Sequence, residues 1–303
     1  MLRVRATLRA LGRLLIRAGQ RLAAAGSDAS RRLATAGESR PPELSGAAGR
    51  SRSGRGSRET GPPRSENRAS SFHAMWELPA AARLVEVSAV LEIVVPPVVP
   101  DLYFWALQVD FASAFRIHGG GHTGLQWNRR YPGGTAVNWG GYASREHGGA
   151  ILPGSVSDLP GFTDDPHTLA YPWECERPYL LRIFRPSNRL GVWRAEVTEL
   201  STGRTSVVRD LYVDGDSLAR PIVWSEVFAD CDAPSVTVRW SDLQAIDETG
   251  NVLQPERIRV NYQPASQGGC TNTTVTADAW GLLQVTNTAR TAPQGSVVGL
   301  RGR

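Results

Sequence analysis

Apolar and polar residues alternate along much of the chain from about residue 72 onward. Within residues 85–95 the apolar side chains fall on one face of an extended chain, and Glu86, Ser88 and Glu92 fall on the other. An alternation with a period of two residues is typical of half-buried β-strands. Similar runs occur at residues 103–111, 124–128, 135–142, 179–184, 192–200, 205–211, 221–228, 236–242, 258–263 and 282–288.

Turn-forming Pro, Gly, Asn and Asp residues separate these runs, and no amphipathic stretch of helical length appears after residue 70. Many short strands with close turn spacing are typical of antiparallel sandwiches and barrels. The pattern therefore predicts an all-β fold, an antiparallel β-sandwich made by a single domain over residues 71–288.

The first 70 residues have a different pattern. Residues 2–24 carry an arginine at every fourth position and leucines on the opposite side of a helix, which predicts a short amphipathic helix able to contact a membrane surface. The alternative is that an Arg-, Ala- and Leu-rich sequence produces this pattern by chance. Residues 37–70 contain almost nothing apolar, so we predict disorder there. We also predict a flexible tail over residues 289–303.

The net charge of +5 conceals a division between these two parts. Residues 1–70 contain 15 Arg and 5 acidic residues, whereas the remainder holds 34 − 15 = 19 basic and 29 − 5 = 24 acidic residues. The predicted domain is thus mildly acidic, and its composition does not favour binding to nucleic acid. Every basic residue is Arg, which is typical of a GC-rich bacterial genome.

The cysteines and the N-terminal segment bear on the cellular compartment. No apolar run long enough for a secretory signal or a membrane span is present, which makes the cytoplasm the default. Cys231 and Cys270 flank predicted strands and form the favoured disulfide, leaving Cys175 free. A disulfide indicates an oxidising compartment, so export stays open if translation starts downstream, for example at Met75.

The tryptophans are expected to fill the core. Large aromatic side chains dominate the interior of β-sandwiches, and four of the nine tryptophans lie within clear strand runs. We therefore predict that the core contains Trp105, Trp193, Trp224 and Trp240.

The glycine-rich stretch 119–142 predicts a hairpin with two different faces. A three-residue loop after Tyr131 would place Trp127 opposite Trp139 and Asn128 opposite Asn138. This register separates an apolar face from a polar one. The polar face would carry Gln126, Asn128, Arg130 and Asn138.

Planar amides and arginines suit the paired hydroxyls of a sugar, and an aromatic ring can cover its C–H face. Tyr142 and Trp173 could supply that ring. The polar face therefore predicts a non-catalytic carbohydrate-binding site with a glycan partner, and the alternative is an ordinary solvated sheet face.

An enzymatic function has one candidate residue. Glu226 alternates with Trp224 and Phe228, so its carboxyl group falls on an apolar face and could serve as an acid or base. A core ion pair with Arg239 or Arg182 is the structural alternative. Asp230 lies four residues further along a strand, roughly 13 Å away, which is too far for a retaining glycosidase pair.

Motifs for cofactors and metals are weak. His118 and His122 lie on a glycine-rich stretch and lack a third ligand at a recognisable spacing. No phosphate-binding loop, serine nucleophile elbow or zinc signature occurs, so we predict no cofactor.

Several runs, among them YFWALQV, GLQW, AVNWGGY, PYLLRIFRP and PIVWSEVF, resemble an uncharacterised bacterial domain family similar to the concanavalin-type lectin and glucanase sandwiches. The resemblance covers residues 100–265 and implies a concanavalin-like jelly roll. It implies no catalytic residue, since the acidic motif of the glucanases is missing. Sequence reasoning thus favours a carbohydrate-binding module over two alternatives, a glycoside hydrolase or lyase using Glu226 and a structural or protein-interaction domain.

Overall fold

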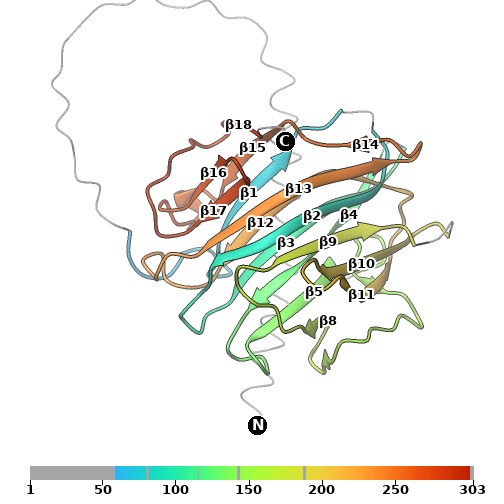
Figure 1. The fold of residues 1–303 in the computed structure, drawn as a ribbon, viewed down its shortest axis with the longest axis horizontal. Helices are drawn as coiled ribbons and strands as arrows, with labels where there is room; N and C mark the ends of the chain where they lie inside the picture. Colours follow the sequence, from blue (N-terminus) through green and yellow to red (C-terminus); the bar gives the residue numbers. More distant parts are fainter. Residues whose placement is uncertain (1–58, 80–81, 115, 142–143, 187–188, 301–303) are drawn as a thin grey trace, which may run out of the picture.

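The computed structural model describes residues 59–79, 82–114, 116–141, 144–186 and 189–300. These residues form 18 antiparallel strands and one short 3-10 turn at Ala265–Gln267, which confirms the predicted all-β fold (Figure 1). Within the same ranges no helix is long and apolar enough to cross a membrane. The predicted helix over residues 2–24 lies outside the described residues.

Pairing between neighbouring strands divides them into two layers. The first layer has the order β18–β15–β1–β12–β3–β4–β5–β8–β7. Its strands are β18 (Val297–Gly299), β15 (Arg257–Tyr262), β1 (Ser70–Trp76), β12 (Ser217–Val227), β3 (Tyr103–Ser113), β4 (Arg116–Trp127), β5 (Thr135–Gly141), β8 (Asp165–Ala170) and β7 (Gly161–Phe162).

The second layer has the order β16–β17–β13–β2–β9–β10–β11–β6, with β14 (Val252–Leu253) paired to the far end of β13. One residue pair, Leu218 with Leu84, joins the two layers into a continuous sheet. The strands are β16 (Thr274–Asp278), β17 (Gly281–Val285), β13 (Thr237–Asp247), β2 (Leu84–Val95), β9 (Pro178–Phe184), β10 (Val192–Glu199), β11 (Arg204–Tyr212) and β6 (Ala150–Ile151).

The main core lies between the layers and is rich in aromatic side chains. Trp105, Trp193 and Trp240 are completely or almost completely buried there, as the alternation predicts. The ring of Phe111 contacts Trp193 of the second layer at a centroid distance of 5.8 Å, which ties the layers together. Trp224 is the exception, because it packs in a separate cluster with Phe104 on the opposite face of the first layer.

Residues 59–70 are not the disordered segment that their composition predicts. The backbone N–H of Cys231 donates to the carbonyl of Gly61, and the N–H of Arg64 donates to the carbonyl of Gly268. Backbone hydrogen bonds such as these do not require apolar side chains, which is why the composition missed them. The start of β1 at Ser70 also places this segment directly against the sheet.

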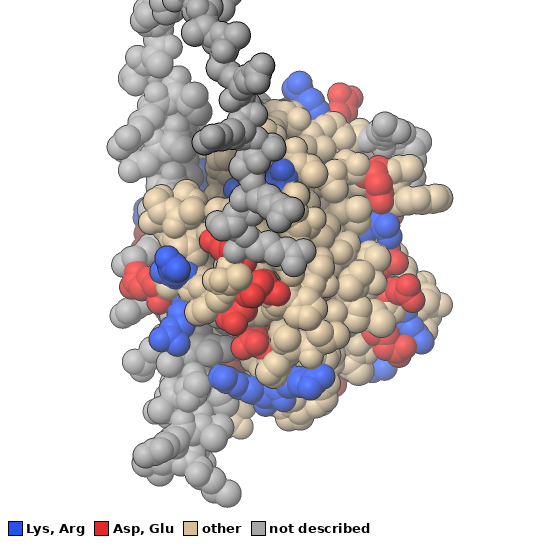
Figure 2. Space-filling view, turned by 90° about the vertical axis from the view of Figure 1, so that its left-hand side faces the viewer, with Lys and Arg blue, Asp and Glu red and all other residues tan. Residues whose placement is uncertain are grey.

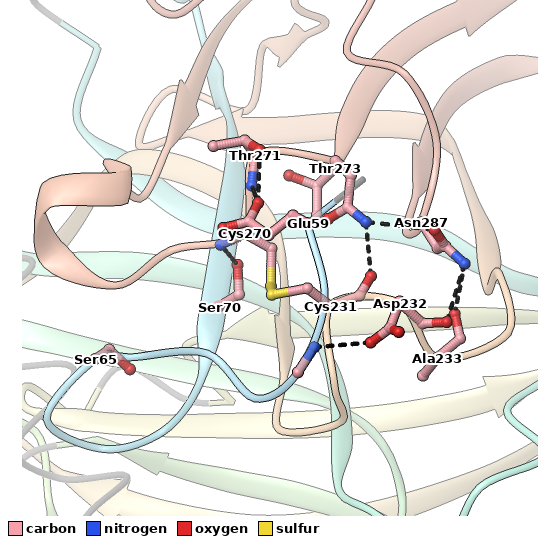
Figure 3. Close-up of a disulfide and its surroundings, with 12 residues drawn as sticks. Glu59, Ser65, Ser70, Cys231, Asp232, Ala233, Cys270, Thr271, Thr273 and Asn287 are labelled. Carbon is pink, nitrogen blue, oxygen red and sulfur yellow. Dashed lines mark hydrogen bonds between the residues drawn. A yellow bond between two sulfur atoms is a disulfide. The ribbon is translucent and has the colours of Figure 1, made fainter. Parts of the chain in front are cut away.

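A disulfide stands beside this segment. Cys231 and Cys270 are bonded, with 5.6 Å between their Cα atoms, whereas Cys175 is free and exposed. Figure 3 shows the disulfide next to the segment that carries Glu59 and Ser70. The Ser70 hydroxyl accepts a hydrogen bond of 2.9 Å from the N–H of Cys270. This bond connects the disulfide directly to the start of β1.

The C-terminal residues also differ from their prediction. Residues 289–300 are part of the fold, because β18 pairs with β15 and the Arg290 side chain donates to the carbonyl of Thr273. The charged side chains of the described surface are mixed in sign on the side shown in Figure 2. Many of them are paired, as in the contacts of Arg83 with Asp216 and Glu248.

Candidate active site

The hairpin formed by β4 and β5 sets the geometry of the candidate site. Its connection is longer than predicted, since Trp127 pairs with Thr135 and Asn138 pairs with Gly124. The predicted register, with Trp127 opposite Trp139, is therefore wrong. The side chain of Asn128 accepts from the N–H of Arg130 and holds the turn, so it caps the hairpin instead of facing a ligand.

The predicted separation of the two faces nevertheless holds in part. Trp139 lies in the main core and Trp127 packs against it. Gln126 and Asn138 point to the other side of the first layer, because they alternate with these tryptophans along their strands. We call this side the outer face.

Four side chains form a row across the outer face. Ser71 of β1 pairs with Glu226 of β12, Glu226 pairs with Phe104 of β3, and Phe104 pairs with Gln126 of β4. Directly opposed residues of an antiparallel sheet point to the same side. Glu226 and Gln126 are therefore separated by two strand spacings, about 10 Å between backbones, and their side chains extend over the same side.

Glu226 is buried, with 3% of its surface exposed. Its Oε1 atom accepts a hydrogen bond of 3.1 Å from Nδ2 of Asn67, and it also interacts with the Ser71 side chain. Burial raises the pKa of Glu226 to about 7, although both hydrogen bonds act in the opposite direction. This carboxyl group can therefore take up and release a proton near neutral pH.

The ion pairs proposed as the structural alternative do not occur. Arg239 pairs with Glu92 and Asp278, and Arg182 pairs with Glu86 and Glu196. The sequence also placed Glu226 on a core-facing side together with Trp224. Both residues instead face away from the main core, because the alternation of β12 directs Val223, Ser225 and Val227 inward.

Gln126 is the second unusual residue of the row. It is completely buried, and neither Oε1 nor Nε2 has a hydrogen-bond partner in the described part of the chain. A buried amide without partners costs folding free energy, about 1–3 kcal/mol for each unsatisfied group. Such groups are uncommon in native proteins, and a binding or catalytic role is one reason for keeping them.

Three aromatic rings form a wall beside this row. Phe104 contacts Trp224 and His122 with centroid distances of 4.9 and 5.5 Å, and the latter two rings are 5.6 Å apart. Ala106, which pairs with Trp224 and follows Phe104 by two residues on β3, has a small side chain that leaves room for the rings to meet. Burial lowers the pKa of His122 to about 4, so this wall is uncharged at neutral pH.

Other residues predicted to bind a ligand lie elsewhere. Trp173 belongs to the main core and contacts Trp105 edge to face, so its ring is not available to cover a sugar. Arg130 is exposed within the turn, and Tyr142 lies outside the described residues. The ring of His118 is hydrogen-bonded to Ser113. Among the described residues, no cluster of three or more His, Cys, Asp or Glu could hold a metal ion.

A second carboxylate does not accompany Glu226 on the described outer face. Asp230 is exposed beyond the end of β12. Asp110 lies on the outer face but six residues further along β3 than Phe104, roughly 20 Å away, and is paired with Arg220. The paired carboxyl groups of a glycoside hydrolase are therefore not formed by these residues.

Comparison with known proteins gives a distant likeness. No family model matches the sequence, and no curated protein is similar to it. A scytalido-glutamic peptidase bound to a peptide-based transition-state analogue has a TM-score of 0.45 and 10% identity, covering 73% of this chain and 98% of its own. SCP-B, a peptidase of the eqolisin family, was solved with the tripeptide Ala-Ile-His and has a TM-score of 0.42 and 8% identity, covering 76% and 100%.

The prediction of a carbohydrate-binding module is wrong. The predicted sugar-binding face is not an open polar surface, since Gln126 and Asn138 are buried and Asn128 is used in the turn. The alternative of a glycoside hydrolase is not supported either, because no second carboxylate stands beside Glu226 on the described outer face.

Burial of Glu226 should make the stability of the fold depend on pH. Its folded pKa of about 7 lies above the ordinary value of 4.5, so its contribution to stability is present below pH 4.5 and is lost as the pH rises through 7. Glu226→Gln, which stays neutral, should raise the free energy of unfolding by about 2–4 kcal/mol at pH 8 and change it little at pH 4.

Urea unfolding of both proteins at the two pH values checks this prediction. His73 and His122, whose pKa values are lowered to about 4 by burial, act in the opposite direction, but they do so equally in both proteins. Equal stability of the two proteins at pH 8 would mean that Glu226 ionises normally in the fold.

Proposed function

We propose that the chain is a hydrolase of peptide amide bonds in which Glu226 transfers protons and Gln126 stabilises the developing oxyanion. The observation that carries the proposal is the row across the outer face. It aligns a proton-transferring carboxyl group with an amide whose hydrogen-bonding atoms are uncommitted.

The reaction needs no reactant other than water. Ionised Glu226 takes a proton from a water molecule, and the water oxygen bonds to the carbonyl carbon of the substrate. The carbonyl oxygen becomes negatively charged, and Nε2 of Gln126 donates a hydrogen bond to it. Protonated Glu226 then passes its proton to the substrate nitrogen, the C–N bond breaks, and a carboxylic acid and an amine leave.

An amide substrate suits a carboxyl group of this kind better than an ester does. A nitrogen leaving group must be protonated before it departs, whereas an alkoxide or phenoxide can leave with less help. A pKa near 7 allows the same group to act first as base and then as acid, because efficiency is greatest when the pKa is close to the working pH.

Mass spectrometry of products tests the proposal. The full chain is incubated with an internally quenched peptide library and, in parallel, with a panel of oligosaccharides, between pH 3 and pH 8. We expect peptide fragments that have gained one water, and about 100-fold less of these products or lower still with Glu226→Gln. Cleavage by this variant at the wild-type rate, or peptides that stay intact at every pH, would contradict the proposal.

A further inference from the structure

Asn138 lies on the outer face next to Gln126. It pairs with Gly124, which stands two residues before Gln126 on β4, so the two amides are diagonal neighbours across the β4–β5 pair. Such diagonal positions are about 7–8 Å apart. The position opposite Asn138 has no side chain, and a Cβ atom there would meet the backbone of Trp105 and Ala106 on β3, so only glycine fits at this point of the sheet.

The amide of Asn138 is held in one orientation by a chain of hydrogen bonds. The hydroxyl of Thr168 donates to Oδ2 of Asp165 at 2.7 Å. Its oxygen therefore accepts from Nδ2 of Asn138 at 2.9 Å. Because a carboxylate only accepts, the direction of both bonds is fixed, and the nitrogen of Asn138 must face Thr168.

This arrangement leaves one acceptor without a partner. Asn138 is 5% exposed, and its Oδ1 atom has no hydrogen-bond partner among the described residues. Thr168, which holds the other end of the amide, is fully buried. A fixed and buried acceptor without a donor is costly unless a ligand supplies the donor.

We propose that Oδ1 of Asn138 accepts a hydrogen bond from a backbone N–H of the substrate and thereby positions the scissile carbonyl group at Gln126. The inference rests on the proposed function. An extended peptide spans about 3.3–3.6 Å per residue, so the separation from Gln126 corresponds to an N–H one or two residues from the cleaved bond. Asn138 is in this account a positioning residue, and Asp165 and Thr168 fix its orientation.

Replacing individual amides of the substrate by esters tests this contact. A cleaved peptide is compared with analogues in which each neighbouring N–H is replaced in turn by oxygen, while the scissile amide is kept. Asn138→Leu, which has a similar volume but no acceptor, should reduce kcat/KM for the parent peptide about 10- to 100-fold. For one ester analogue the wild type and the variant should be equally active, because the donor is already missing.

Two further variants test the orientation of the Asn138 amide and provide a matched control. Thr168→Val removes the acceptor that orients the amide, and we expect a smaller loss that depends on the same substrate N–H. Asn261→Leu changes the same residue type on β15, five strands away from β5 in the first layer, where its side-chain oxygen already accepts from Gln294, and should leave cleavage unchanged. Melting temperatures show whether each variant is folded.

The outcomes separate this inference from the proposed function. If the wild type cleaves peptides but Asn138→Leu affects the parent peptide and every ester analogue equally, or affects none of them, the contact with Asn138 is refuted and the hydrolase proposal stands. If the wild type neither cleaves these peptides nor binds them, as followed by tryptophan fluorescence, both are refuted.

Discussion

Glu226→Gln is expected to reduce kcat/KM for a cleaved peptide by about 10²–10⁴-fold, the usual contribution of a positioned general acid–base group. Gln is nearly the same size, and its Oε1 atom can still accept from Asn67, so the fold and the hydrogen bond of 3.1 Å are retained. The amide of the variant cannot take up a proton from water or pass one to the substrate nitrogen. Steady-state kinetics with a single quenched peptide measures the effect.

The pH dependence of kcat/KM also tests whether Glu226 acts as the base. Below its pKa of about 7, Glu226 is protonated and cannot take a proton from water. We therefore expect kcat/KM of the wild type to fall about tenfold for each pH unit below that value, and the residual rate of the variant not to follow this titration. Glu248→Gln, an exposed acid in an ion pair with Arg83, is the matched control and should leave the rate unchanged.

Removal of the disulfide should produce the largest loss of stability. The bond joins residues 39 positions apart, and in the chain-entropy model a loop of this length contributes about 3–4 kcal/mol. The double variant Cys231→Ala, Cys270→Ala should lose that amount, as measured by urea unfolding. Cys175→Ser alters an exposed free thiol and should have no effect.

The same variant should also disturb the candidate site. The disulfide holds the loops that bind residues 59–70, and Asn67 of this segment contacts Glu226. A loosened segment would expose the carboxyl group to water and lower its pKa toward the ordinary range. A loss of stability below about 1 kcal/mol would show that the backbone hydrogen bonds of this segment suffice without the covalent link.

The period-two alternation predicted the class of fold because it depends only on which face of a strand is buried. The same reasoning identified Glu226, since a carboxyl group among Trp224 and Phe228 conflicts with its surroundings. It assigned Trp224 to the main core because the first layer has buried residues on both sides, and alternation alone does not distinguish the interior from a covered outer face.

The placement of Glu226 and Gln126 in the same row of the sheet could not be predicted from the sequence. The two residues are 100 positions apart in the sequence, and they lie in one row only because β3 pairs with both β12 and β4. Asn67 was missed for a different reason, since its segment is anchored by backbone hydrogen bonds that composition does not reveal. The polar residues of the hairpin predicted a sugar site because exposure was assumed, whereas Gln126 and Asn138 are buried.

The pKa of Glu226, measured in the folded protein and in the reaction, tests the account most directly. Glutamate labelled with ¹³C at the carboxyl carbon gives one resonance per residue, and Glu226→Gln identifies the one from Glu226. We predict a titration midpoint of about 7 that coincides with the pKa in the pH profile of kcat/KM for peptide cleavage. A midpoint near 4.5, or a rate that does not follow the titration of this residue, would contradict the account.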